Sequence, residues 1–275
     1  MQENRKREIR VKADEFREKC KVGRYGIIDL FRDCDRLGYK LIRYPQGDAA
    51  DLGFCLLRDG DEVIYTNSSS RLSREIFTLA HEIGHLILHM GIGNSFMDDS
   101  LTISGRVEDE NEKEANYFAA CLLMPAEDVH KFIDHEIADF ESNRLGTLDV
   151  ARMMSEFNVS FDMALNRLES LGIISGEEKL LLDNERNEMK VGNLLRSVGG
   201  NSRLNMPAGE ICIPFEYLDY VIYNYNHKAI PKETLERVLN CYQLGIEDIA
   251  DRLIAQEDED EGDLDDLIGG LKVNH

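Results

Sequence analysis

Two histidines stand four residues apart with a glutamate between them, in the run His81-Glu82-Ile83-Gly84-His85. On a helix, residues four apart lie on the same face, so both imidazoles can bind one tetrahedral zinc ion. Glu82 is offset around the helix, within reach of a water molecule at the open coordination position. This H-E-x-x-H pattern is typical of zinc metalloproteases, in which the glutamate is the general base.

The residues around the motif have the apolar spacing of a buried helix. Ile76, Leu79, Ile83 and Leu86 recur at intervals of three or four. Two core or surface histidines without a shared function could stand four residues apart by chance. The complete H-E-x-x-H motif on an otherwise apolar helix disfavours this alternative. We therefore predict an amphipathic helix that turns both histidines into a cleft.

A catalytic zinc with two histidines needs a third protein ligand and keeps its fourth position for water. The acidic segment 108–116 supplies candidates, because it opens a second predicted helix, Ala115–Met124. Spacing alone leaves Glu108, Glu112 and Glu114 open. Each of them also fits an exposed helix N-terminus, where the helix macrodipole favours acidic side chains.

Taken together, the two motifs resemble those of the ImmA/IrrE family of metallo-endopeptidases. The first reads FTLAHEIGHLILH from Phe77 to His89, and the second reads E-x-x-A-N-x-F-A-A-x-L-L-M-P from Glu112 to Pro125. The likeness extends upstream to Gly53 and downstream to about Ile174. It implies a cytoplasmic protease of bacteria, phages or mobile elements that holds one zinc ion per chain, with Glu112 completing the zinc site. It also implies a protein substrate, a helix-turn-helix repressor whose cleavage relieves transcriptional repression.

Three further residues are expected to support the zinc ligands without binding the metal. His89 lies one helical turn beyond His85 and matches a common family position. Asn116 and Glu114 are candidates for a hydrogen bond to a ligand histidine. The sequence does not identify the donor that would stabilise the oxyanion.

Two other functions use the same residues. One is a helix-turn-helix regulator with a structural zinc, but such a site closes all four positions with His or Cys and needs no base. The other is a regulatory module that binds a partner without cutting it. Because Glu82 is present, the leading hypothesis is a zinc-dependent endopeptidase that cuts a specific protein.

The composition excludes several classes of protein. The chain has 275 residues and a net charge of −21, which disfavours direct binding to nucleic acid and is compatible with a basic partner protein. No apolar run is long enough to cross a membrane, and the charged N-terminus lacks the apolar core of a signal peptide. Six scattered cysteines without a C-x-x-C pair indicate reduced thiols. We expect a cytoplasmic protein.

The predicted fold class is α+β. Helices are expected before residue 38 and a short strand over Tyr39–Tyr44. Segments 54–57 and 62–66 flank Asp59-Gly60, a strong hairpin signal. These strands are expected to form a small antiparallel sheet against the zinc helix, as in a minimal zincin-like core. An edge strand beside the metal would hold an extended substrate by strand addition.

Four regions are expected along the chain. Residues 1–130 form the zinc metallopeptidase core and 131–176 a helix-turn-helix-like subdomain, with helices near 148–154 and 161–168. Residues 177–256 form a helical extension of unknown role, and 257–275 an acidic tail. The second of the paired helices offers Arg167 as its only strong cation, so we interpret this subdomain as packing against the core without reading DNA.

Overall fold

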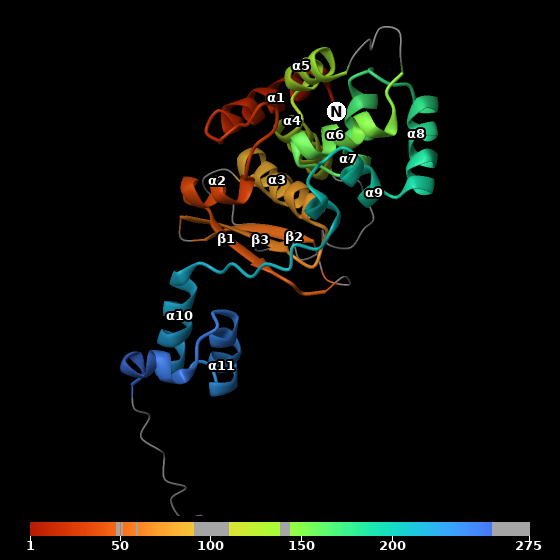
Figure 1. The fold of residues 1–275 in the computed structure, drawn as a ribbon. Coiled ribbons are helices and arrows are strands. Elements are labelled where there is room, and N and C mark those ends of the chain that lie inside the picture. Colours follow the sequence, from red (N-terminus) through yellow and green to blue (C-terminus); the bar gives the residue numbers. More distant parts are fainter. Residues whose placement is uncertain (48–49, 51, 59, 91–109, 138–143, 255–275) are drawn as a thin grey trace, which may run out of the picture. The chain divides into compact units, whose positions relative to one another are not determined.

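The computed structural model describes residues 1–47, 50, 52–58, 60–90, 110–137 and 144–254 (Figure 1). Its strands form one sheet in the order β1-β3-β2, made of β1 (Lys40–Tyr44), β2 (Gly53–Arg58) and β3 (Asp61–Asn67). The predicted hairpin is present, because β2 and β3 are antiparallel with Arg58 opposite Asp61. Gly60 has φ +92°, the left-handed conformation that such a tight turn requires.

The predicted all-antiparallel sheet is wrong, because the sheet is mixed. β1 runs parallel to β3, with Lys40 opposite Val63 and Tyr44 opposite Asn67. The β2–β3 hairpin separates β1 from its partner in the sequence, so β1 pairs with the edge of β3 that β2 leaves free. Turn residues specify a hairpin locally, but no local pattern states which edge a non-adjacent strand will take.

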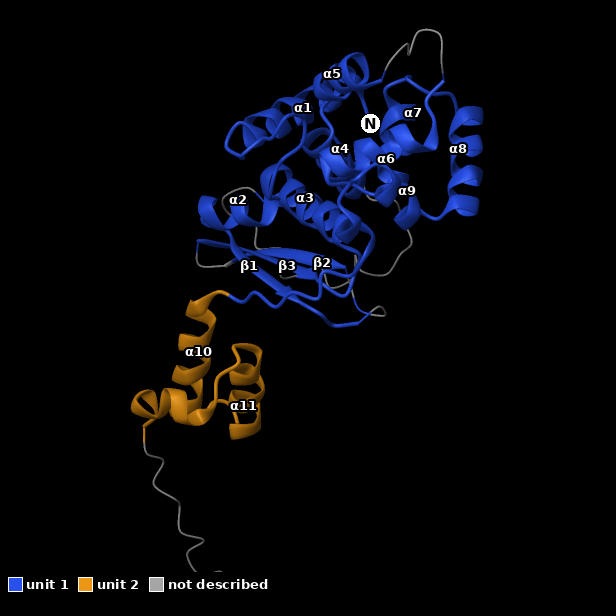
Figure 2. Cartoon of the chain, in the orientation of Figure 1, with its two compact units in different colours: residues 1–213 blue, residues 214–275 orange. Residues whose placement is uncertain are grey.

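The described chain forms two compact units, coloured separately in Figure 2. Residues 1–213 form the first unit, and the second begins at Pro214. The boundaries expected after residues 130 and 176 fall inside the first unit, because one buried apolar cluster runs through it from Ile9 to Leu204. The second unit has its own core, centred on Leu218, Ile222 and Leu239. The tail 257–275 lies outside the described residues.

The helix that carries H-E-x-x-H, α3 (Leu72–Leu88), packs between the sheet and a second helix. α4 (Glu110–Leu123) lies along α3, and α1 (Glu3–Arg17) covers α4 (Figure 1). Leu79 and Ile83 of α3 are fully buried, as their spacing predicts. α3 is thus fixed on both sides, and its remaining face is available to the site.

A buried ion pair ties α3 to the sheet. Glu75 is fully buried and accepts two hydrogen bonds from the Arg43 guanidinium of β1, at 2.8 and 2.9 Å. The hydroxyl of Thr66 on β3 donates a third, at 2.9 Å. A buried carboxylate is tolerated only when paired and hydrogen-bonded in this way. The three groups therefore fix where α3 begins, two turns before the histidines.

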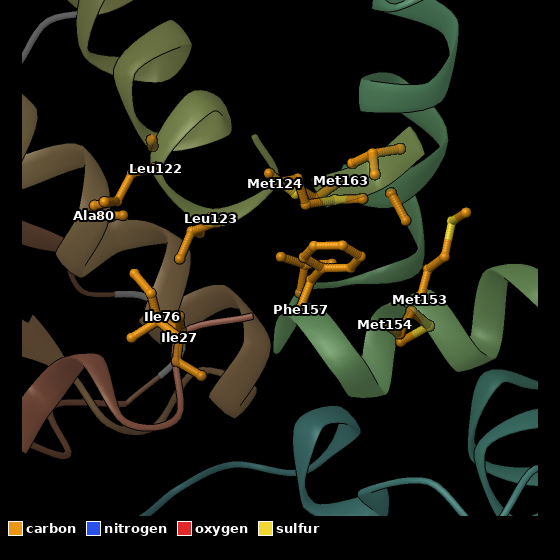
Figure 3. Close-up of a cluster of buried hydrophobic side chains, with 14 of the residues drawn as sticks. Ile27, Ile76, Ala80, Leu122, Leu123, Met124, Met153, Met154, Phe157 and Met163 are labelled. Atoms are coloured by element: carbon orange, nitrogen blue, oxygen red, sulfur yellow. The ribbon is translucent and has the colours of Figure 1, made fainter. Parts of the chain in front are cut away.

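The other helices complete the two units. In the first unit they are α2 (Leu30–Leu37), α5 (Ala126–Glu136), α6 (Thr147–Phe157), α7 (Phe161–Ser170), α8 (Gly176–Met189), α9 (Val191–Ser197) and the short η1 (Ser202–Asn205). The second unit contains α10 (Phe215–Asn226), α11 (Lys232–Cys241) and η2 (Ile246–Arg252). Apolar side chains from α3, the end of α4, α6 and α7 meet in one cluster (Figure 3). All six cysteines are free thiols. Among the described residues, no helix is long and apolar enough to cross a membrane.

The helix-turn-helix-like pair is α6 and α7, joined through Asn158 in a left-handed conformation at φ 56°. Ser160 caps α7 by accepting a hydrogen bond from the backbone N–H of Met163. Arg167 is buried and donates to the carbonyl oxygen of Met124 at 2.8 Å. Its guanidinium therefore joins α7 to the end of α4 and is turned away from solvent.

Candidate metal centre

Three side chains from two helices converge on one point. His81 and His85 on α3 bring their Nε2 atoms to 3.0 Å from each other. The Glu112 carboxylate of α4 reaches both, with one oxygen 3.2 Å from His81 Nε2 and the other 3.2 Å from His85 Nε2. The structure thus brings together the two motif histidines and the carboxylate that the family resemblance singled out.

The three donor atoms fit a tetrahedral metal ion. Ligand atoms about 2.0–2.2 Å from a tetrahedral zinc stand about 3.3–3.6 Å apart. The observed separations of 3.0 and 3.2 Å are close to that edge length. Two imidazoles and one carboxylate are also the donor set of catalytic zinc sites that keep one position open. The residues therefore fit the divalent cation that the sequence implies.

Gly84, inside the motif, allows the close approach of the two helices. A Cβ atom at this position would lie 3.1 Å from a ring carbon of Phe118 and 3.2 Å from the Cα of Ala115. Both neighbours belong to α4, and backbone atoms cannot move aside as a flexible side chain can. The absent side chain therefore lets α4 lie near enough to α3 for Glu112 to reach the histidines.

Glu82 lies beside this cluster and is almost fully buried. Burial raises the pKa of its carboxyl to about 7, and the negative charge of Glu112 adds to the rise. A hydrogen bond from the Cys55 thiol on β2 opposes it. A carboxyl with a pKa near neutrality can both accept and return a proton, which is the requirement for general acid–base catalysis.

β2 passes close to Glu82 because it begins with a glycine. A Cβ atom at Gly53 would lie 2.5 Å from Thr78 and 3.6 Å from the Cγ of Glu82. Among the described strands, β2 pairs only with β3, so its other edge is unpaired beside the site. An unpaired strand edge can bind the main chain of an extended peptide.

Of the three predicted supporting residues, Asn116 and His89 each contact a ligand histidine, whereas Glu114 contacts His89. Asn116 Oδ1 is 3.1 Å from Nδ1 of His81. His89 Nδ1 is 3.0 Å from Nδ1 of His85, and His89 Nε2 is 3.1 Å from a carboxylate oxygen of Glu114.

These contacts leave Nε2 of each ligand histidine as the atom that faces Glu112. When Nδ1–H of His81 donates to Asn116, Nε2 carries the lone pair that a metal needs. Burial lowers the pKa of His81, which keeps its imidazole neutral and able to bind a cation. His85 gains the same orientation through His89 and Glu114.

Arg5 extends this set of contacts to the N-terminal helix. Its guanidinium donates two hydrogen bonds to the two oxygens of Glu114, at 2.9 and 2.6 Å. This contact lowers the pKa of Glu114 and so keeps it ionised against His89. Arg5 and Cys55 were not identified from the sequence, because neither lies near a motif. Glu108, the remaining ligand candidate, lies outside the described residues.

A small mixed sheet under a helix with H-E-x-x-H, completed by a carboxylate from the next helix, is the arrangement of a zincin-like metallopeptidase. Residues 34–169 match the family model Peptidase_M78, described as the IrrE N-terminal-like domain. That segment contains β1 to β3, α3, α4 and every residue of the cluster. The chain belongs to the ImmA/IrrE family of metallopeptidases.

One curated relative supports this assignment. The chain is 43% identical over 83 residues to the radiation response metalloprotease IrrE of Deinococcus radiodurans. The match covers 27% of this chain and 25% of the relative. The chain therefore spans about a quarter of the relative's length, and the likeness concerns part of each protein.

Proposed function

We propose that this protein is a zinc-dependent endopeptidase that cuts a specific protein substrate. The observation that supports this most directly is the placement of the buried Glu82 carboxyl beside His81, His85 and Glu112. A structural metal site needs no such base and closes its fourth position with a protein ligand. Three ligand groups and a neighbouring base are the parts of a hydrolytic site.

When bound, a zinc ion supplies Lewis acidity, which lowers the pKa of a water molecule and polarises the carbonyl of a peptide bond. Glu82 accepts a proton from the attacking water and returns it to the leaving amine. Asn116 and His89 hold the two imidazoles in the orientation that leaves Nε2 free. The unpaired edge of β2 holds the substrate main chain in an extended form next to Glu82.

The proposed substrate is a helix-turn-helix transcriptional repressor, and its cleavage would relieve repression. Two observations support this choice. The two motifs resemble those of a family whose members characteristically cut such repressors, and the chain's charge of −21 complements a basic DNA-binding protein. The free cysteines support a reducing, cytoplasmic site of action.

Co-expression with a helix-turn-helix repressor from the same genome tests the proposal. The parent chain is expected to give one discrete cleavage product, detected by mass spectrometry. Glu82→Gln keeps the size and neutral hydrogen bonding of the side chain but removes the base. The product is therefore expected to fall at least about 100-fold, while one zinc per chain remains bound.

Asp61→Asn is the matched control, because it removes one carboxylate from an exposed position of the same unit. It is expected to cleave like the parent. Circular dichroism of each variant reports whether the fold is kept. Cleavage that persists in a folded Glu82→Gln protein would contradict the proposed role of Glu82.

A further inference from the structure

A cleft of about 1060 Å³ opens beside the metal centre within the first unit. One wall is the N-terminal half of α3, including Arg74 and Phe77, and the other includes Tyr117 of α4 and Phe161 of α7. Asn116, whose side chain contacts His81, also lines it. The cleft therefore borders the metal centre at Asn116.

The charge of the cleft is opposite to that of the chain. Its lining contains four arginines and a single acidic residue, Asp162, although the chain carries −21 overall. Arg186 pairs with Asp162, and the buried Arg167 bonds to a backbone carbonyl. Arg71 and Arg74 are exposed, and neither side chain has an ion-pair or hydrogen-bond partner among the described residues. Two guanidinium groups therefore line the cleft without a partner carboxylate in the described part of the chain.

The position of Arg74 on α3 sets its distance from the metal centre. Phe77 precedes His81 by four residues and Arg74 precedes it by seven, so all three lie on one face of the helix. Seven residues of α-helix rise about 10.5 Å, and an extended peptide covers that distance in about three residues. Arg74 thus stands about three extended residues from His81 along the helix axis, at the height of the third side chain of a substrate that runs along α3.

We propose that the substrate chain continues from the edge of β2 into this cleft, which Leu52, the residue before β2, also lines, and that Arg74 selects an acidic side chain about three residues from the cleaved bond. The inference rests on the proposed peptidase function and adds a substrate preference to it. A guanidinium and a carboxylate form two parallel charge-assisted hydrogen bonds, which gives both orientation and selectivity. Phe77 and Phe161 supply apolar surface for a neighbouring residue of the substrate. The acidic requirement is local and is compatible with a substrate that is basic as a whole.

Peptide binding to the zinc-loaded, full-length Glu82→Gln protein tests this inference, because that variant holds a peptide without cutting it. The probes are fluorescently labelled, capped ten-residue peptides of neutral sequence with one Phe and one Glu, the Glu being moved through every position. Each has a partner peptide with Gln in place of Glu. Fluorescence anisotropy gives the dissociation constants.

The best Glu peptide is expected to bind about tenfold more tightly than its Gln partner. Adding Arg74→Gln is expected to bring that ratio to about one. Arg32→Gln is the matched control, since Arg32 on α2 is also exposed and lies outside the cleft lining, and it is expected to leave the ratio unchanged.

Three results would overturn the inference: no binding of any peptide, equal binding of Glu and Gln peptides, or a preference that survives Arg74→Gln. Cleavage of the repressor by the parent chain is measured separately, in the co-expression experiment. If cleavage depends on Glu82 but the peptides show no acidic preference, only the role of Arg74 fails. If the acidic preference is present but no repressor is cut, the proposed function fails and the cleft remains a peptide-binding site.

Discussion

His81 and His85 each have a polar partner on the ring nitrogen that faces away from Glu112. Asn116 contacts His81. His89 contacts His85, Glu114 contacts His89, and Arg5 donates hydrogen bonds to Glu114. Partners of this kind fix the tautomer and the ring orientation of a metal-binding histidine before the metal arrives. The affinity for zinc should therefore depend on residues that never touch the ion.

We expect Asn116→Ala and Glu114→Gln each to weaken zinc binding about 10- to 100-fold, because Asn116 orients His81 directly and Glu114 orients His85 through His89. Arg5→Gln is expected to have a smaller effect in the same direction, since it acts only through Glu114. Glu8→Gln is the control, because it removes the other carboxylate that Arg5 contacts. Competition with a chromophoric chelator measures the dissociation constants. Affinities equal to that of the parent in the first two variants would show that these contacts do not hold the ligands.

Individual site residues differed in how well the sequence could predict them. His81, Glu82 and His85 follow from a five-residue pattern, because one helical turn fixes their geometry. Glu112 needed the family resemblance, since several acidic residues open the same helix and any of them can be placed near a metal. Arg5 could not be predicted, because it meets Glu114 across 109 residues of sequence.

At the scale of the elements, the site depends on how closely α3 and α4 approach. Gly84→Ala adds a methyl group where the nearest atoms of α4 lie at 3.1 and 3.2 Å. Alanine favours a helix by about 1 kcal/mol over glycine, but overpacking costs about 1–3 kcal/mol. We therefore expect a net loss of about 1 kcal/mol in the free energy of unfolding and weaker zinc binding, as α4 moves Glu112 away.

Urea denaturation and the zinc competition assay measure these two effects. Gly176→Ala provides the comparison: it also lies in a helix of the same unit, but its added methyl group would meet only a side-chain oxygen of Glu169, at 3.4 Å. Unchanged zinc affinity in Gly84→Ala would mean that the spacing of the two helices does not position Glu112.

The order of the elements was more predictable than their pairing. The apolar spacing of α3 and the Asp59-Gly60 hairpin signal both correspond to elements of the structure. The direction of β1 was predicted wrongly, because it depends on which edge of β3 remains free after the hairpin forms. Strand direction in this sheet is a property of the assembled layers and not of any one segment.

The whole molecule has two units with separate apolar cores, and the proposed ligands all belong to the first. Removal of zinc is therefore expected to destabilise residues 1–213 alone. At a free zinc concentration of about 100 times Kd, the ion contributes about 2.7 kcal/mol, which corresponds to about 5–10 °C in the Tm of a unit of this size. Hydrogen exchange with and without a chelator measures protection in each unit. Equal loss of protection in α10 and α11 would contradict this assignment.

The amino-acid composition determines the net charge of the molecule but does not show where the charged side chains lie. The value of −21 pointed to a basic partner, whereas the cleft beside the metal centre is lined by arginines with a single acidic residue. Arg71 and Arg74 share one wall of the cleft because both stand at the start of α3. The sequence alone could not show that this end of the helix faces a cavity. The proposed local substrate preference is thus opposite in sign to the preference that the net charge suggests.

The central claim is that His81, His85 and Glu112 hold one zinc ion whose fourth position is left to water. X-ray absorption spectroscopy of the zinc-loaded full chain tests it most directly, because it reports the number, type and distance of the ligands. The expected result is four nitrogen or oxygen ligands at about 2.0–2.2 Å, of which two are imidazoles. A sulfur ligand at about 2.3 Å, or a third imidazole, would contradict the claim that His81, His85 and Glu112 are the protein ligands of the ion.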